Sequence, residues 1–301
     1  MSTFVQDKVV VVTGAGSGIG RDIARAFAAH GASVVVNDLG KDKETGQPTA
    51  QQVAEEIRRD GGTAVAAVES VSEWAAAHRI VQATLDNFGR IDCVVNNAGI
   101  VRDRFIFNMS EEEWRAVVDV HLNGSFFMTR AAAQHFKSQQ GGSYVHMTSS
   151  SGLFGNLGQA NYAAAKLGIV ALSKSIALDM AKFGVRSNCI APWAWTAMTA
   201  TIPADTAENL VRIDKLKKME SAKIAPLAVY LASEQAGHVS GQIFGARGNE
   251  LYLFNQIGIA RSMHRGEGWT PQTIADHGMP AFEASFARNA PSMAYTPWDP
   301  V

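Results

Sequence analysis

Residues 9–30 constrain the fold more than any other part of the sequence. Four consecutive valines at 9–12 lead into a glycine-rich segment at 13–20, and an amphipathic stretch follows at 21–30. A short continuous apolar run suits a strand that is buried on both faces, as in a parallel sheet. Glycine lets the backbone turn tightly, and the N-terminus of the next helix offers free N–H groups to a phosphate. The segment therefore predicts an α/β fold with an anion-binding first turn.

The same alternation continues along the chain. Further apolar runs predict strands at 34–37, 64–68, 91–96, 143–147, 185–190 and 242–246. The stretches between them predict helices at 51–60, 73–88, 111–137, 160–183 and 225–232, with a weakly helical polar stretch at 199–222. Such βαβα order implies a Rossmann-like, doubly wound parallel sheet covered by helices on both faces. We expect one domain at 1–250 and a C-terminal extension at 251–301 that packs on the core or on a neighbouring subunit.

Composition excludes several classes of protein. The net charge of −1 gives no electrostatic reason to expect nucleic acid as a partner. No apolar run has the length that a membrane span needs. Cys93 and Cys189 lie in apolar segments, without the spacing of a zinc site or a disulfide framework. We therefore expect no metal, two buried thiols and a reducing, cytoplasmic location.

The first turn carries glycines in the spacing Gly14-x-x-x-Gly18-x-Gly20. This differs from the common dinucleotide fingerprint G-x-G-x-x-G, but the strand before it and the helix after it support the same use. The N–H groups at the start of the helix, which include those of Ser17 and Ile19, would contact the pyrophosphate.

Asp38 ends the second predicted strand, eighteen residues after Gly20. A carboxylate there accepts hydrogen bonds from the adenosine ribose, and it repels a 2′-phosphate. No basic side chain that would neutralise such a phosphate stands at Ala15, Ser17 or Leu39. We therefore expect the cofactor to be NAD rather than NADP.

Tyr162 and Lys166 lie four residues apart on a predicted helix and so share one face. An ammonium about 4 Å from the phenol, at an effective dielectric constant near 20, favours the phenolate by roughly 4 kcal/mol. We expect this pair to bring the phenol toward neutral pH, where it serves as a general acid or base. Ser149 follows the predicted strand at 143–147, at the edge where parallel sheets bind ligands, and its hydroxyl can polarise a substrate oxygen.

Taken together, these residues resemble the short-chain dehydrogenase/reductase family over about residues 5–250. The family's motifs stand here as Thr13-Gly14-x-x-x-Gly18-Ile19-Gly20, Asn96-Asn97-Ala98-Gly99, Ser149 and Tyr162-x-x-x-Lys166. The resemblance implies that Tyr162 is the acid/base and that Ser149 positions the reacting oxygen. It also implies that Lys166 holds the nicotinamide ribose and that Asn96 supports the central sheet. The expected cofactor contacts are Gly14, Ser17, Gly18, Ile19, Gly20, Asp38, Leu39, Ser70, Val71, Asn97, Ala98, Gly99, Tyr162, Lys166 and Thr196.

The chain departs from the family's pattern at two places. His121 stands where the family usually has a catalytic asparagine, and it either replaces that residue or belongs to a different proton relay. Pro192-Trp193 replaces the usual Pro-Gly, and the resemblance implies that Thr196, a few residues later, contacts the nicotinamide carboxamide. The segment Val120-His121-Leu122-x-Gly124-Ser125-Phe126 is similar to dehydrogenase domains of peroxisomal multifunctional β-oxidation enzymes and their free-standing bacterial relatives.

That similarity implies a small-molecule substrate, either a (3R)-hydroxyacyl-CoA or a hydroxysteroid, and a homodimer or homotetramer. Arg102 and Arg104 are candidate contacts for CoA phosphates. The apolar side chains of Phe154, Trp193, Trp195 and Met198 are candidates for the wall of an acyl or sterol pocket. Two alternatives stay open: a 3-oxoacyl reductase working in the reverse direction, and a non-catalytic NAD-sensing module.

Overall fold

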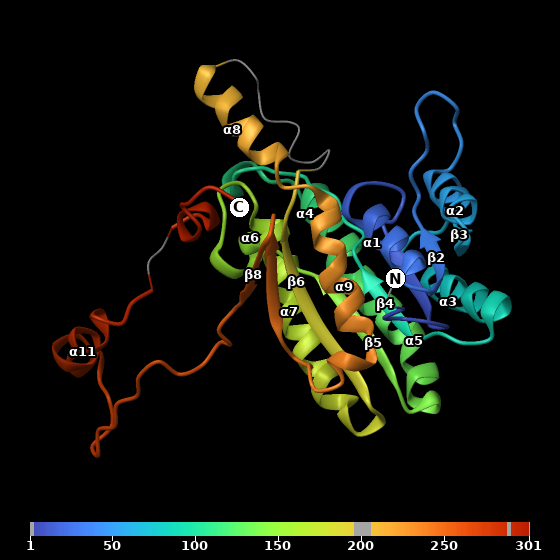
Figure 1. Cartoon of the computed structure of the whole chain (residues 1–301). Coiled ribbons are helices and arrows are strands. Elements are labelled where there is room, and N and C mark those ends of the chain that lie inside the picture. The colour runs from blue at the N-terminus through green and yellow to red at the C-terminus, as the bar shows by residue number, and fades with distance from the viewer. Residues whose placement is uncertain (1–2, 196–205, 288–289, 301) are drawn as a thin grey trace.

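The computed structural model describes residues 3–195, 206–287 and 290–300. Within them one eight-stranded sheet runs through the molecule in the order β3-β2-β1-β4-β5-β6-β7-β8 (Figure 1). Strands β1 to β7 are parallel, and β8 pairs antiparallel with β7. The predicted α/β, Rossmann-like fold is thereby confirmed. The strands are β1 (Val9–Thr13), β2 (Ser33–Asn37), β3 (Thr63–Ala67), β4 (Cys93–Asn96), β5 (Gly142–Met147), β6 (Val185–Trp193), β7 (Ile243–Arg247) and β8 (Glu250–Leu253).

Helices cover both faces of the sheet, as a parallel sheet requires (Figure 1). All five residues of β1 are buried, with Val10 and Val12 in one apolar cluster and Val11 in another. One cluster joins β1 to α1, α2 and α9, and the other joins it to α3, α5 and α7. The helices are α1 (Gly18–Ala29), α2 (Thr49–Arg59), α3 (Trp74–Phe88), α4 (Glu111–Val118), α5 (Gly124–Gln139), α6 (Ser150–Phe154), α7 (Ala160–Asp179), α8 (Ala207–Lys217), α9 (Ala225–Ala232), α10 (Pro271–Thr273) and α11 (Met279–Glu283).

The long helix predicted at 111–137 is not uniform. A π-helical segment, η2 (Asp119–Asn123), separates α4 from α5. Its wider turn is accompanied by a hydrogen bond from the Ser125 hydroxyl to the His121 carbonyl oxygen at 2.6 Å. Such π segments often occur at functional sites, and this one carries His121.

Beyond β8 the chain leaves the body of the molecule, passes through α11 and returns near α6 (Figure 1). Large apolar side chains of this arm, residues 255–287, lie in the open: Ile257 is 79% exposed, Ile259 is 89% and Phe286 is 61%. The returning end contacts the core, where the Ser292 N–H donates to the Gly155 carbonyl oxygen at 3.2 Å. The division of the chain at residue 250 stays a prediction, but β8 adds the start of the extension to the sheet.

Cys93 and Cys189 are both free and buried, which confirms their predicted packing role. Among the described helices, none combines the length and the apolar character that crossing a membrane demands.

Candidate active site

The residues with predicted roles gather at the carboxyl edge of the sheet. The glycine turn follows β1, Asp38 follows β2, Asn97 follows β4 and Ser149 follows β5. The strand order runs outward in opposite directions from the β1–β4 pair, and open α/β sheets bind ligands at such a point of reversal. The topology therefore brings these groups to one rim.

Close packing fixes the glycine turn against the loop after β4. Gly14 and Gly18 have φ values of +62° and +52°, a conformation that side chains disfavour. A Cβ on Gly14 would lie 2.6 Å from the Cα of Ala98. The Asn97 side chain donates from Nδ2 to the carbonyl oxygens of Thr13 and Gly14, at 2.9 and 3.0 Å. The turn is thus held in place before any ligand contact.

The start of α1 suits a pyrophosphate. The helix begins at Gly18, and the side chain of the N-cap residue Ser17 does not bond its first-turn amides. Those N–H groups and the positive end of the helix dipole are therefore available to an anion. The Asp38 carboxylate lies beside the same turn. Its Oδ2 accepts the Gly16 N–H at 2.8 Å, and its Oδ1 accepts the Gly40 N–H at 2.6 Å. These residues fit the phosphates and the adenosine ribose of a dinucleotide.

Ser149, Tyr162 and Lys166 converge on the same rim. Tyr162 and Lys166 lie in the first two turns of α7, and the Lys166 Nζ is 5.5 Å from the centroid of the Tyr162 ring. Lys166 is buried, and its Nζ donates to the Met147 carbonyl oxygen at 2.6 Å. Ser149 caps α6, and its side chain hydrogen-bonds that of Tyr162. The structure thus brings the three predicted catalytic residues together.

The pKa of Tyr162 is shifted upward, whereas the sequence predicts that Lys166 lowers it. Burial raises the pKa of Tyr162, and the hydrogen bond from Ser149 opposes that rise. Burial also lowers the pKa of Lys166 to about 7. Both charged forms lose water, and the ammonium lies on a backbone carbonyl. The pair on its own therefore does not make the phenol acidic, and the expectation that it does was wrong.

His121 packs directly on Tyr162. The two rings meet edge to face, with their centroids 5.1 Å apart. The His121 Nε2 lies 3.0 Å from the Ile100 N and 2.7 Å from the Ile100 O, so its tautomer decides which contact is the hydrogen bond. A Cβ on Gly99 would lie 2.3 Å from the His121 ring, so this site requires glycine. Burial, and then the charge of Lys166, lower the pKa of His121 to about 3, which keeps the ring neutral.

Sequence reasoning missed Asn161, a buried residue that positions Tyr162. Its Nδ2 donates to the carbonyl oxygens of Arg102 and Glu113, both at 3.0 Å, and its Oδ1 accepts the Tyr162 N–H at 2.7 Å. It therefore ties the start of α7 to the loop after β4 and to α4. A signal was present, because an amide at 161 shares the buried helix stripe of Ala165 and Ile169.

The remaining predicted contacts lie around this rim with varied surroundings. The Ser70 hydroxyl bonds that of Ser72 at 2.8 Å, and Val71 is buried against Gly124. Leu39 is exposed, as an adenine-side contact can be. Thr196 and Met198 lie outside the described residues.

Asn96 is buried in the sheet. Its Nδ2 lies 3.2 Å from the Nδ1 of His146 on β5 and 3.4 Å from the Thr129 Oγ1 on α5. These contacts join two strands and a helix, as the expected supporting role requires.

The substrate-side candidates are partly engaged by other groups. Arg104 forms an ion pair with Glu113 at 2.9 Å, whereas Arg102 stays exposed. Phe154 stacks on Tyr295 of the returning C-terminal end, with centroids 3.9 Å apart. Trp193 also packs on the extension, but edge to face, with its ring centroid 5.6 Å from that of Tyr252. The proposed apolar wall therefore includes side chains of the extension.

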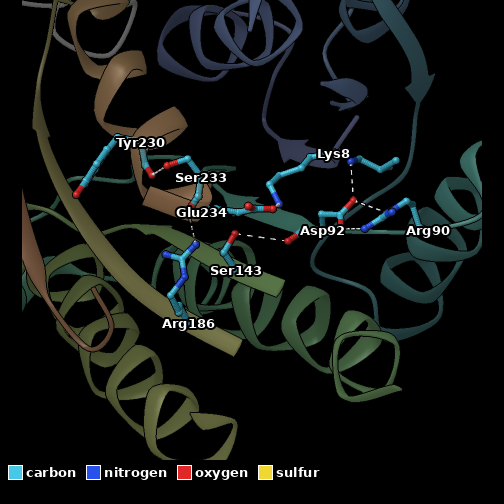
Figure 2. Close-up of polar contacts among 9 residues, drawn as sticks. Lys8, Arg90, Asp92, Ser143, Arg186, Tyr230, Ser233 and Glu234 are labelled. Carbon is cyan, nitrogen blue, oxygen red and sulfur yellow. Dashed lines mark hydrogen bonds and ion pairs between the residues drawn. The ribbon is translucent and has the colours of Figure 1, made fainter. Parts of the chain in front are cut away.

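A cavity of about 320 Å³ opens at the opposite, amino-terminal edge of the sheet. Figure 2 shows its polar groups engaged with the protein itself: Arg90 pairs with Asp92, and Arg186 reaches the Ser233 carbonyl oxygen at 3.0 Å. Arg186 also donates to the Leu231 carbonyl oxygen at 2.6 Å, so it satisfies carbonyl groups at the end of α9. The polar groups of this cavity are therefore engaged in structural contacts. We take the carboxyl edge of the sheet as the candidate active site.

Comparisons with known proteins agree with this geometry. The family described as short chain dehydrogenase matches residues 8–207. The peroxisomal multifunctional enzyme type 2 of Mus musculus is 43% identical over 277 residues, 90% of this chain and 36% of that protein, so the chain spans about a third of that enzyme. A hydroxyacyl-CoA dehydrogenase, ChsB1, of Mycobacterium tuberculosis is 38% identical over 282 residues, 91% of this chain and 88% of that one. A crystal structure of a short chain dehydrogenase from Mycobacterium avium superposes with a TM-score of 0.83 at 36% identity, covering 96% of this chain and 98% of that one.

Proposed function

Since the chain belongs to the short-chain dehydrogenase family and is an oxidoreductase of that family, we propose that it oxidises a secondary alcohol to a ketone with NAD. The observation that carries the proposal is the convergence of Ser149, Tyr162 and Lys166 on the rim that also holds the glycine turn. Binding and proton transfer would then take place at adjacent points of one edge.

The residues divide the chemistry between them. Tyr162 accepts the proton of the substrate hydroxyl, while the Ser149 hydroxyl donates a hydrogen bond to the substrate oxygen and orients it. Lys166 favours the phenolate. While its amine is protonated, below a pKa of about 7, its charge lies 5.5 Å from the ring centroid and contributes up to about 3 kcal/mol at an effective dielectric constant near 20, which burial outweighs in the absence of a cofactor. NAD, held by the glycine turn and by Asp38, would supply the acceptor for the hydride of the carbinol carbon, and its positive charge would oppose the effect of burial on the Tyr162 pKa.

His121 and Asn161 hold the acid/base in position. The edge-to-face contact with His121 limits rotation of the Tyr162 ring, and Asn161 fixes the backbone of the same residue. A neutral histidine serves here because a second cation beside Lys166 would raise the cost of burying the ammonium. We propose that His121 takes the place of the family's usual asparagine by packing and hydrogen bonding, without titrating.

The choice of NAD rests on Asp38. Its carboxylate is held by two backbone amides and carries a negative charge at the place where the adenosine ribose is expected. A 2′-phosphate there would meet charge repulsion with no counter-charge from Leu39. NAD is therefore the cofactor that we propose.

For the substrate we propose a 3-hydroxyacyl-CoA or a hydroxysteroid. The name of the similar mycobacterial protein, a hydroxyacyl-CoA dehydrogenase, supports the first class. The aromatic side chains of Phe154 and Trp193, with their partners on the extension, suit a long apolar group. Arg102 is exposed on the same side and suits a CoA phosphate.

The partner that we propose is a second copy of the chain, in a homodimer or homotetramer. The arm carries apolar side chains of Ile257, Ile259 and Phe286 that the protomer does not cover. Exposed apolar groups in such number favour burial against another surface. The molar mass of the full chain in solution tests the assembly.

For the location we propose the cytoplasm. The two buried free thiols are consistent with such a reducing setting.

One assay tests the central proposal. The purified chain is given a 3-hydroxyacyl-CoA or a 17β-hydroxysteroid with NAD or NADP, and the reduced dinucleotide is followed by absorbance in both reaction directions. We expect turnover with NAD in the oxidising direction. Intact NAD binding without turnover of any alcohol would favour a non-catalytic NAD-sensing module, and faster reduction with NADPH would favour a 3-oxoacyl reductase.

A further inference from the structure

Thr49 holds a loop that touches the Asp38 carboxylate. It is the first residue of α2 and is partly buried. Its Oγ1 and its backbone N–H both donate to the Gly40 carbonyl oxygen, at 3.1 and 2.9 Å. A single residue thus fixes Gly40 through two hydrogen bonds.

Gly40 passes this constraint to the carboxylate. Its N–H donates to the Asp38 Oδ1 at 2.6 Å, and the Gly16 N–H donates to Oδ2 at 2.8 Å. Each carboxylate oxygen therefore receives one amide, and the two amides come from different segments of the chain. With both oxygens engaged in this way, the carboxylate cannot rotate without losing a charge-assisted hydrogen bond.

The space around this contact is full. A Cβ on Gly16 would lie 2.2 Å from the Thr49 Oγ1 and 2.8 Å from the Asp38 Cγ. A Cβ on Gly40 would lie 2.8 Å from the same hydroxyl and 2.9 Å from the Asp38 Oδ1. The Thr49 hydroxyl therefore occupies the position between the glycine turn and the loop at 40–48, next to the carboxylate.

We propose that Thr49 is a positioning residue for cofactor selection, which keeps the Asp38 carboxylate turned toward the adenosine ribose of NAD by holding Gly40. The inference rests on the proposed function. Each carboxylate oxygen keeps lone pairs for a ribose hydroxyl. A 2′-phosphate instead meets a fixed negative charge, and the two nearest amides are already engaged.

Two cations stand near this site and would act in the opposite sense. Lys41 and Lys43 lie on the same loop and would attract a 2′-phosphate. Both side chains are exposed, so solvent and salt screen that attraction. The fixed carboxylate is partly buried and therefore has the larger effect on selection.

The test compares Thr49→Val, which removes only the hydroxyl, with Thr49→Ser, which keeps it. Dissociation constants for NAD and NADP are measured by calorimetry on the full chain, together with kcat at saturating NAD. We expect Thr49→Val to weaken NAD binding about 3- to 10-fold, the effect of one hydrogen bond, and to lower the preference for NAD over NADP. We expect kcat to stay unchanged and Thr49→Ser to restore the affinity.

Thr45→Val is the matched control, because the Thr45 hydroxyl bonds Asp42 at 2.8 Å in the exposed part of the same loop. It should leave NAD affinity unchanged. In an Asp38→Ala background, Thr49→Val should have no further effect, because the hydroxyl acts through the carboxylate. An equal loss with and without Asp38, or no loss at all, overturns the inference. A wild-type chain that binds neither dinucleotide removes the proposed function instead.

Discussion

Replacing Lys166 with methionine tests the electrostatic core of the proposed mechanism. Methionine has a similar length and helix propensity but no charge. With the ring centroid taken as the position of the negative charge, 5.5 Å from Nζ, the lost interaction of the protonated amine is worth up to about 3 kcal/mol at an effective dielectric constant near 20. That energy corresponds to roughly two pKa units of Tyr162. Below the Lys166 pKa of about 7, where the amine is charged, the reactive phenolate fraction, and with it kcat, should therefore fall by up to about 100-fold in Lys166→Met.

The assay is the pH dependence of kcat at saturating NAD and alcohol, with dinucleotide binding measured separately. The loss should shrink as the pH rises above about 7, because the wild-type Lys166 amine then loses its proton and its charge. Lys174→Met on the same helix removes a charge about 12 Å further along α7 and serves as the control, with a wild-type profile expected. A Lys166→Met profile that superposes on the wild type, with NAD binding unchanged, would refute any role of the charge in this site. An unchanged kcat at saturating NAD at every pH, with NAD binding weakened, would assign Lys166 to ribose binding alone.

The remaining predictions concern the proton, the cofactor and acid stability. Tyr162→Phe should bind NAD normally in a titration yet lose nearly all turnover, and retained activity would contradict the assigned proton acceptor. Asp38→Ala should weaken NAD binding and relax discrimination against NADP, and unchanged selectivity would contradict the ribose role. Burial lowers the pKa values of His121 and His146 in the folded chain from 6.5 to about 3. As the pH falls from 6.5 to 3, these histidines therefore become protonated in the unfolded chain but stay neutral in the folded chain. Each histidine should therefore lower the free energy of unfolding by about 2–3 kcal/mol as the pH falls from 6.5 to about 4.5. In urea unfolding, His121→Asn should lose less stability than the wild type over the same pH range.

Local pattern was sufficient for the sheet and for the rim of the site. A buried parallel strand needs a continuous apolar run, and the turn that follows it needs particular residues at particular positions. Val9–Thr13 and the glycines after it satisfy both demands within a dozen residues. Once the strands are parallel, the groups that follow them must meet at one edge, and so Asp38 and Ser149 were placed correctly on the rim from sequence alone.

Contacts between distant segments were not readable in the same way. The Thr49 hydroxyl approaches Gly16 from 33 positions along the chain, and no periodicity reports such an approach. Strand β8 was missed because Glu250–Leu253 is short and partly exposed on its outer face, so its pattern lacks the continuous apolar run of the inner strands. The segment becomes a strand because it pairs antiparallel with β7, and its own sequence does not indicate that pairing.

The pKa of Tyr162 shows why spacing gives proximity but not energy. Four residues of helix bring Lys166 near the phenol, and that part of the sequence argument depended only on helical geometry. The sign of the pKa shift depends instead on how much water both groups lose and on where the ammonium finds its hydrogen bond. In this fold Lys166 is buried on α7, and the Lys166 Nζ donates a hydrogen bond to the Met147 carbonyl oxygen rather than to the phenol. Under the proposed function, the positive charge of bound NAD would favour the phenolate of Tyr162, so dinucleotide binding and proton transfer would be coupled.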